Sequence, residues 1–204
     1  MRSPKTAERQ GIDPMRKELG KFPAVFPMPV LMIAAYDENG VVNVMNAAWG
    51  MVASSDKIVL FIDEDHKTTQ NIFKTKAFTV SLADKAHMAE ADYFGIATGN
   101  KVPDKFAKSG LTAVKSDKVN APVIEAFPVC MECELAEVVH TDTINCIVGT
   151  IVSLSADEKV LGDNGKIDPS KLDAILFDQF QAGYYTIGEK AGQAWNAGAD
   201  LMNQ

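Results

Sequence analysis

Two apolar segments on either side of an Asn-Gly dipeptide constrain the fold of this chain more than any other feature. The segment PVLMIAAYD (29–37) runs into DENG (37–40), and VVNVMNA (41–47) follows directly. Asn-Gly readily adopts the positive-φ conformations of two-residue hairpin loops, in part because glycine lacks a Cβ atom. The sequence therefore predicts an antiparallel hairpin over residues 29–47.

Further strands are predicted wherever a run of apolar and β-branched residues is bounded by polar turn residues. These segments are 57–63, 77–83, 127–140 and 143–155. The last two are long and should pair around Thr141 and Asp142. Short helices are predicted at 68–75 with a threonine cap, at 84–98 with Asp84 as the cap, and at 102–110, ending at Gly110. Many long antiparallel strands with few helices favour a barrel or a sandwich.

The length and composition suit one globular domain. The chain has 204 residues, of which 47% are hydrophobic, so it can bury a substantial core. Residues 1–14 are polar and precede a second methionine, Met15. We interpret them as a disordered or non-native N-terminus and expect the domain to occupy residues 15–204. Polar residues interrupt every apolar run before the roughly 18 residues of a membrane span, so no transmembrane helix is expected.

Charge and cysteine content narrow the functional classes. A net charge of −7 disfavours general nucleic-acid binding, which needs a basic face. The first ten residues lack the apolar core of a secretory signal, so the cytoplasm is the expected location. Three cysteines cannot all pair within one chain, which agrees with a reducing compartment. A small or weakly charged partner, rather than a nucleic acid or a membrane, fits these features.

The C-x-x-C spacing of Cys130 and Cys133 could indicate zinc or redox chemistry. On a strand, however, residues three apart point to opposite faces with Cα atoms roughly 10 Å apart, beyond the disulfide range of about 4.4–6.8 Å. We therefore predict structural cysteines. His66, His87 and His140 show no metal-ligand spacing, and no metal is expected. The sequence also lacks a nucleophile elbow, a phosphate loop and a dinucleotide fingerprint.

Two segments combine residues suited to a flat anionic ligand. In NVMNAAWGMVASSD (43–56), the small residues Ala47 and Ala48 would let an aromatic ring approach the backbone. In DEDHKTTQNI (63–72), lysine and threonine side chains lie where a strand leads into a helix, and free helix N–H groups there favour phosphate. Each feature has a simpler alternative: Trp49 as a core residue, and Thr68 as a helix cap.

The order of several segments resembles the flavin reductase-like FMN-binding proteins, specifically their flavoredoxin-like branch. The resemblance covers residues 23–192 and rests on the following segments: FPMPVLMIAAYDENGVVNVMNAAWGMVASSD, HKTTQNIFKTKAFTVSLAD, ADYFGIATGNKVPDKFAKSGLTAV, NAPVIEAFPVCMECELAEVV and YYTIGEKAG. It implies a mainly β fold, an FMN-binding split β-barrel of Greek-key topology with short peripheral helices. It also implies a homodimer with non-covalent FMN near the subunit interface.

The resemblance assigns the site by matching position. Asn43, Asn46 and Trp49 would surround the flavin ring and ribityl chain, beside Ala47 and Ala48. The residues expected at the phosphate and ribityl end are Ser54, Ser55, Lys67, Thr68 and Asn71. Lys101 would supply a cation near the flavin or phosphate, and His140 and Phe177 are weaker matches to pocket positions. Asp104, Lys105 and Phe106 are expected only to build their short helix.

One segment departs from the family pattern. Many relatives carry prolines after the serine-aspartate element, whereas here SSDKI continues with Lys57 and Ile58, so Ser55 and Asp56 are weaker matches than Trp49 or Thr68. The C-terminal segment YYTIGEKAGQAWNAG should close over the barrel or over a partner, with apolar contact from Tyr184, Tyr185 and Ile187.

The resemblance leaves two functions open. The first is an enzyme in which NADH or NADPH reduces bound FMN, which then reduces free flavin, ferric iron or another small acceptor. The second is a flavoredoxin-type electron carrier that a protein partner reduces. Because the flavin would perform the redox chemistry, no side chain is nominated as catalytic.

Overall fold

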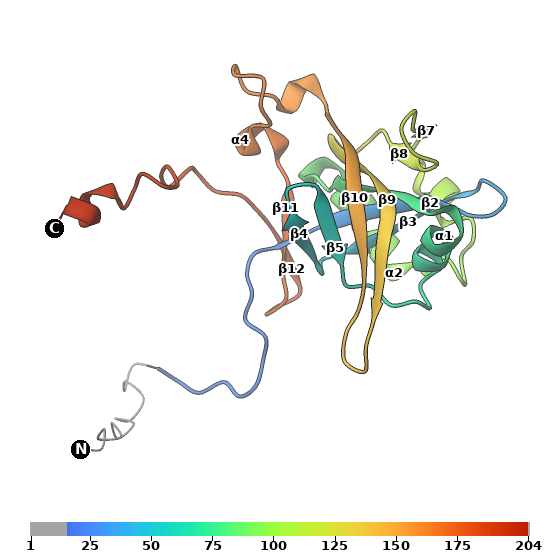
Figure 1. Cartoon of the computed structure of the whole chain (residues 1–204), viewed down its shortest axis with the longest axis horizontal. Coiled ribbons are helices and arrows are strands. Elements are labelled where there is room, and N and C mark those ends of the chain that lie inside the picture. Colours follow the sequence, from blue (N-terminus) through green and yellow to red (C-terminus); the bar gives the residue numbers. More distant parts are fainter. Residues whose placement is uncertain (1–15, 204) are drawn as a thin grey trace.

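The computed structural model describes residues 16–203, so the prediction for residues 1–14 lies outside the described residues. Seven strands form one antiparallel sheet in the order β3-β2-β6-β9-β10-β5-β4 (Figure 1). Their bounds are β2 Leu31–Tyr36, β3 Val42–Ala47, β4 Gly50–Ser54, β5 Lys57–Leu60, β6 Ala77–Leu82, β9 Val129–His140 and β10 Asn145–Ala156. Neighbours such as β2 and β6 are distant in sequence, as in a Greek-key arrangement.

The sheet closes on itself at one end. β3 and β4 are its two edge strands, yet only Ala48 and Trp49 separate them in the chain, and so short a link cannot span more than about 11 Å. At this closure a Cβ on Gly50 would lie 2.5 Å from Leu31 Cδ1 and 2.8 Å from Leu60 Cδ2, so glycine is needed where the edges meet. The predicted split barrel is confirmed.

The core is divided by β2, which is buried on both faces. Leu31, Ile33 and Ala35 point into the barrel with Phe78 and other apolar side chains. The alternate residues of β2 instead pack in a second cluster that includes Phe94. This two-sided burial explains why the segment is apolar without interruption rather than alternating.

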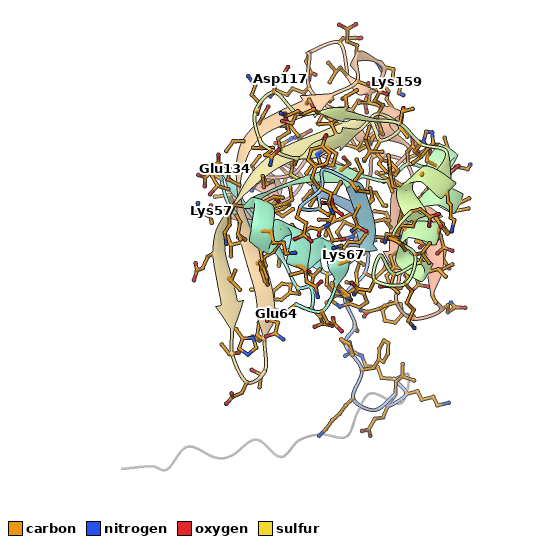
Figure 2. The ribbon with its side chains drawn as sticks, turned by 90° about the vertical axis from the view of Figure 1, so that its right-hand side faces the viewer. Lys57, Glu64, Lys67, Asp117, Glu134 and Lys159 are labelled. Atoms are coloured by element: carbon orange, nitrogen blue, oxygen red, sulfur yellow. The ribbon has the colours of Figure 1, made fainter. Side chains whose placement is uncertain are left out.

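The predicted hairpins are confirmed. β2 and β3 pair from Leu31–Ala47 to Tyr36–Val42, and the Asp37 carboxylate accepts hydrogen bonds from the backbone N–H groups of Asn39 and Val41, both at 2.8 Å. β9 and β10 pair along their whole length up to His140 and Asn145. Their loop carries the hairpin beyond the rest of the barrel (Figures 1 and 2).

The helices agree with prediction except at one cap. Asp84 accepts a hydrogen bond from His87 N at 3.0 Å, which starts the η1–α2 segment as expected, and α3 ends at Gly110 with φ 73°. The threonine cap of α1 is wrong, because the helix begins at Lys67 after His66, which caps it without a side-chain hydrogen bond. The bounds are α1 Lys67–Thr75, η1 Lys85–His87, α2 Met88–Ile96, α3 Lys105–Ser109, η2 Glu158–Val160, α4 Pro169–Leu172 and η3 Ala199–Asn203.

Several short strands were not predicted. They are β1 Met28–Pro29, β4 Gly50–Ser54, β7 Ala113–Lys115, β8 Pro122–Ile124, β11 Ile175–Asp178 and β12 Gly183–Thr186. β11 lies between β1 and β12 in a separate sheet. The C-terminal segment only partly fulfils its prediction: Tyr184 packs against the second cluster, whereas Tyr185 and Ile187 are exposed and the chain beyond them runs away from the barrel (Figure 1).

The cysteines behave as predicted. All three are free and buried, and Cys133 packs inside the barrel. Burial raises the pKa of Cys133 to about 12, so its thiol stays protonated and unreactive at neutral pH. Among residues 16–203, no helix is both long enough and apolar enough to cross a membrane.

Candidate functional site

Two adjoining cavities lie where the β3–β4 crossover meets α2 and the start of α1. The larger has a volume of about 250 Å³ and the smaller about 160 Å³. Both are lined by Met45, Asn46, His66 and Gly95, so the two cavities adjoin, and we refer to them together as the groove. Together their volumes fall within the size range of small-molecule sites, roughly 300–1,000 Å³.

The larger cavity is lined by both aromatic and small side chains. Trp49, Phe61, Phe177 and Tyr184 line it together with Ala47 and Ala48. The ring centroids of Trp49 and Phe177 are 6.2 Å apart, as are those of Phe177 and Tyr184. Trp49 is 53% exposed and is therefore not a core residue, which removes the simpler alternative. Such a slot suits a planar ring that can stack on aromatic side chains.

The smaller cavity combines apolar residues with two lysines. Lys67, Thr68 and Lys105 line it, and Asn43, which is buried, donates a hydrogen bond from Nδ2 to Thr68 Oγ1. Thr68 therefore binds a neighbouring strand rather than capping α1. Figure 2 shows Lys67 at the start of α1, with Glu64 on the preceding loop. The Lys67 ammonium group and the N-terminus of α1 both favour an anion.

Gly99 lies against Asn43 and Lys67, which together with Thr68 form what we call the polar cluster. A Cβ at this position would overlap Asn43 Oδ1 and would lie 3.0 Å from Lys67 Cβ and Cγ. The backbone after α2 can therefore pass directly over Asn43 and Lys67 only if residue 99 has no side chain. Gly99 was not predicted as a site residue.

Lys105 is the buried cation of the site. It is 2% exposed, and its Nζ donates to Ala97 O at 2.8 Å and to Phe94 O at 3.4 Å, at the C-terminal end of α2. Burial lowers the pKa of Lys105 to about 8. The sequence prediction gave Lys105 only a structural role and preferred Lys101, which is exposed and lines neither cavity.

A hydrogen-bonded group joins the aromatic wall to α2. Tyr184 donates from its phenol to Asp92 Oδ1 at 2.9 Å, and Asn46 donates from Nδ2 to Ala91 O at 2.9 Å. Burial, followed by the hydrogen bond to Asp92, raises the pKa of Tyr184 to about 12. The phenol therefore remains protonated at neutral pH.

The structure brings only part of the predicted site together. The predicted residues that line the groove are Asn46, Ala47, Ala48, Trp49, Lys67, Thr68 and Phe177. Asn43 does not line the groove but donates a hydrogen bond to Thr68. The sequence prediction missed several lining residues: Phe61, His66, Gly95, Thr98, Gly99, Lys105 and Tyr184. The sequence indicates His66 only as a potential metal ligand. Its neighbouring residues give no signal that His66, and not His87, lines the groove.

The other predicted site residues do not line either cavity of the same chain. Ser54 and Ser55 lie at the exposed β4–β5 turn, where Ser54 donates to Asp56 at 2.9 Å. His140 lies at the exposed end of β9, 3.3 Å from the Glu64 carboxylate. Asn71 is fully buried in α1 and lines neither cavity. Their assignments to the site stay predictions.

Three potential metal ligands lie just before α1. Ligand atoms of Asp63, Asp65 and His66 all lie within 4.8 Å of one another, and both carboxylates are exposed. Both aspartates precede the cap residue of α1, and exposed acidic groups of this kind are common without a metal.

Comparison with known proteins relates this geometry to a family. The model of the flavin reductase like domain matches residues 23–179. Flavoredoxin from Desulfovibrio vulgaris (Miyazaki F) is 33% identical, covers 90% of this chain and 100% of its own, and has a TM-score of 0.85. Flavoredoxin from Methanosarcina acetivorans is 25% identical, with coverages of 94% and 100% and a TM-score of 0.82.

Two further matches are more distant and provide weaker evidence. An FMN-binding protein from Thermus thermophilus, solved with bound 1-cyclohex-2-enone, is 20% identical, with coverages of 90% and 99% and a TM-score of 0.73, and shares the fold. An uncharacterised protein from Aeropyrum pernix is 27% identical over 127 residues, which are 61% of this chain. The matched part is 48% of that relative, so the chain spans about half its length.

Proposed function

This chain belongs to the flavin reductase-like domain family, and from that premise we propose that it is an FMN-binding oxidoreductase that uses NADH or NADPH to reduce flavin or another small acceptor. The observation that carries this proposal is a groove made of two adjoining cavities, one lined by aromatic rings and the other by two lysines. FMN likewise has two chemically different ends, a planar ring and a phosphate, which a ribityl chain joins. The groove offers one cationic end, which suits the single terminal phosphate of FMN and favours FMN over a dinucleotide.

Each end of the groove has a defined role in binding. Trp49 and Phe177 hold the ring from the side, and the small residues Ala47 and Ala48 allow it to approach the backbone. Lys67, Thr68 and Lys105 receive the phosphate and the adjoining ribityl hydroxyls. Charge-assisted hydrogen bonds to phosphate are worth about 1.5–3 kcal/mol each, so this polar end provides much of the affinity.

The isoalloxazine ring, when bound, supplies the hydride or electron transfer. The protein's own residues bind the cofactor, exclude water from one side of it and leave an open edge for a donor. The exposed indole of Trp49 lies at that edge. Since the groove needs no acid, base or nucleophile for this transfer, no side chain is assigned a catalytic role.

A second function is favoured by one observation, the 33% identity to a flavoredoxin over 90% of the chain. In that case the bound FMN would accept electrons from a protein partner and would react poorly with nicotinamide nucleotides. Stopped-flow mixing of the FMN-loaded protein with NADH or NADPH separates the two. Loss of the oxidised flavin absorbance within seconds supports the enzyme, whereas no reduction by either nucleotide supports the carrier.

We also propose that the active form is a homodimer. The edge strand β4 exposes Met51 and Val52, which are 63% and 73% exposed, next to the exposed Trp49 at the mouth of the groove. Both terminal segments extend away from the barrel (Figure 1) and carry exposed apolar side chains such as Phe22 and Trp195. Apolar edges of this kind are normally covered. The predicted roles of Lys101 and His140 would then belong to the partner subunit.

The dimer predicts a solution mass twice that of one chain. Replacing Met51 and Val52 with glutamate should shift the protein towards monomer, because two buried charges would be introduced into an apolar interface. Sedimentation velocity measures the change, with Val114→Glu, on the far β7–β8 hairpin, as the control. A monomeric wild-type protein with full FMN affinity would contradict the proposal.

For Trp49, we expect Trp49→Phe to perturb the bound flavin more than the fold. The indole is half exposed and so contributes little to the core, but stacking on a ring is worth about 0.5–1.5 kcal/mol. FMN should bind a few-fold more weakly, and the absorbance and fluorescence of the saturated flavin should change. An unchanged flavin spectrum together with a clear loss of stability would instead make Trp49 a structural residue.

A further inference from the structure

Gly95 is the only residue without a side chain among the four that border both cavities of the groove. It lies in the last turn of α2 and is exposed, whereas its neighbour Phe94 is buried. Because glycine carries no Cβ atom, the backbone of α2 itself forms part of the wall at the place where the two cavities meet.

The fold of one chain gives no reason for glycine at this position. Among residues 16–203, the three atoms nearest to a Cβ placed on Gly95 all belong to Asn46 and lie 3.5–3.8 Å away, at ordinary van der Waals distance. The φ angle of Gly95 is not in the positive range that favours glycine, and the helix is capped by Ala97 instead. Alanine would favour the helix more than glycine does. A residue that opposes its local structure without a gain in packing is expected at a functional site.

Hydrogen bonds on both sides of Gly95 hold this part of α2 in place. The buried ammonium group of Lys105 donates to Ala97 O at 2.8 Å, two residues after Gly95. One helical turn before Gly95, Ala91 O accepts a hydrogen bond at 2.9 Å from Nδ2 of Asn46, on the facing strand β3. The helix therefore cannot shift away from the groove without breaking these bonds, and the space beside Gly95 has a fixed size.

On the basis of the proposed flavin site, we propose that Gly95 is a specificity-determining residue, whose missing side chain lets the ligand cross from the aromatic cavity to the lysine-lined cavity against the bare backbone of α2. The ligand that fits such a passage has a narrow chain between a planar ring and an anionic group. In FMN this chain is the ribityl group, which would lie against Gly95. A side chain at this position would occupy the space that the linker needs.

Gly95→Ala tests this role, because its expected effects on stability and on binding have opposite signs. The melting temperature of the flavin-free protein should rise by about 1–4 °C, since alanine favours the helix and meets no clash. The dissociation constant for FMN should nevertheless rise at least about fivefold, since the methyl group overpacks the passage once the linker is present. Thermal unfolding without flavin and flavin fluorescence titration measure the two effects.

Gly188→Ala is the matched control. A Cβ on Gly188 would also meet open space, with no atom within 4 Å, but this residue lines neither cavity of the groove, so the variant should bind FMN as the wild-type protein does. Wild-type FMN affinity in Gly95→Ala overturns the passage while leaving the flavin site intact. A lower melting temperature of flavin-free Gly95→Ala also overturns the inference, because the fold itself would then need the glycine. A wild-type protein that does not bind FMN overturns the proposed function, and this inference with it.

Discussion

Replacing Gly99 with alanine is expected to lower the affinity for FMN by at least about tenfold and to destabilise the fold by roughly 1–3 kcal/mol, the usual cost of overpacking. The added methyl group would overlap Asn43 Oδ1 and press on the Lys67 side chain. Asn43 cannot move aside without breaking its hydrogen bond to Thr68. Denaturant unfolding and flavin fluorescence titration measure the two effects.

A double substitution separates the clash from the function. Asn43→Ala removes the side chain that the new methyl group would strike, so Gly99→Ala should cost much less stability in that background than in the wild-type protein. FMN affinity should stay low in the double variant, because the Asn43–Thr68 hydrogen bond is still missing. Wild-type affinity in Gly99→Ala would remove this polar cluster from the binding site.

The elements that could be predicted from sequence are those whose signal is local. The hairpin was predictable because Asp37 accepts hydrogen bonds within its own turn and Gly40 adopts the positive φ, 78°, that the turn requires. The η1–α2 segment was predictable because the cap, Asp84, lies within three residues of the group that it binds. In each case the stabilising partner is only a few residues away in the chain.

The missed strands depend on distant partners. β4 shows an almost uniformly exposed pattern, so it lacks the alternation that identifies a half-buried strand, and it is held by its pairing with β5. β11 pairs with β1 and β12, and β1 is nearly 150 residues away in the sequence. Neither strand carries an independent signal in its own residues.

The same distinction applies to the site. Trp49 and Thr68 could be identified because unusual residue types occur together in short segments. Lys101, Lys105 and Lys108 lie within eight residues of one another, and only the packing of α3 against α2 determines that Lys105 is buried. A pattern of residue types does not show which of these lysines faces the groove.

The burial of Lys105 leads to the second large prediction, which concerns pH. The folded protein lowers the pKa of Lys105 to about 8, whereas lysine in an unfolded chain titrates near 10.4. Between these values the unfolded chain binds a proton that folded Lys105 has released. The contribution of Lys105 to the stability of the flavin-free protein therefore rises with pH across this window, and the full cost of burying its charge applies below pH 8.

FMN should reverse this preference, because a phosphate beside Lys105 favours the charged ammonium group. Above pH 8, binding must therefore recover a proton, and the dissociation constant for FMN should rise by about tenfold between pH 7 and pH 9. Lys105→Met should bind FMN about ten- to a hundredfold more weakly at pH 7 and should lose most of this pH dependence. Lys108→Met changes an exposed lysine of the same helix, which pairs with Asp104, so it is the matched control and should retain the pH dependence. A wild-type affinity that does not change between pH 7 and pH 9, measured by flavin fluorescence, would show that the buried ammonium group does not contact the phosphate.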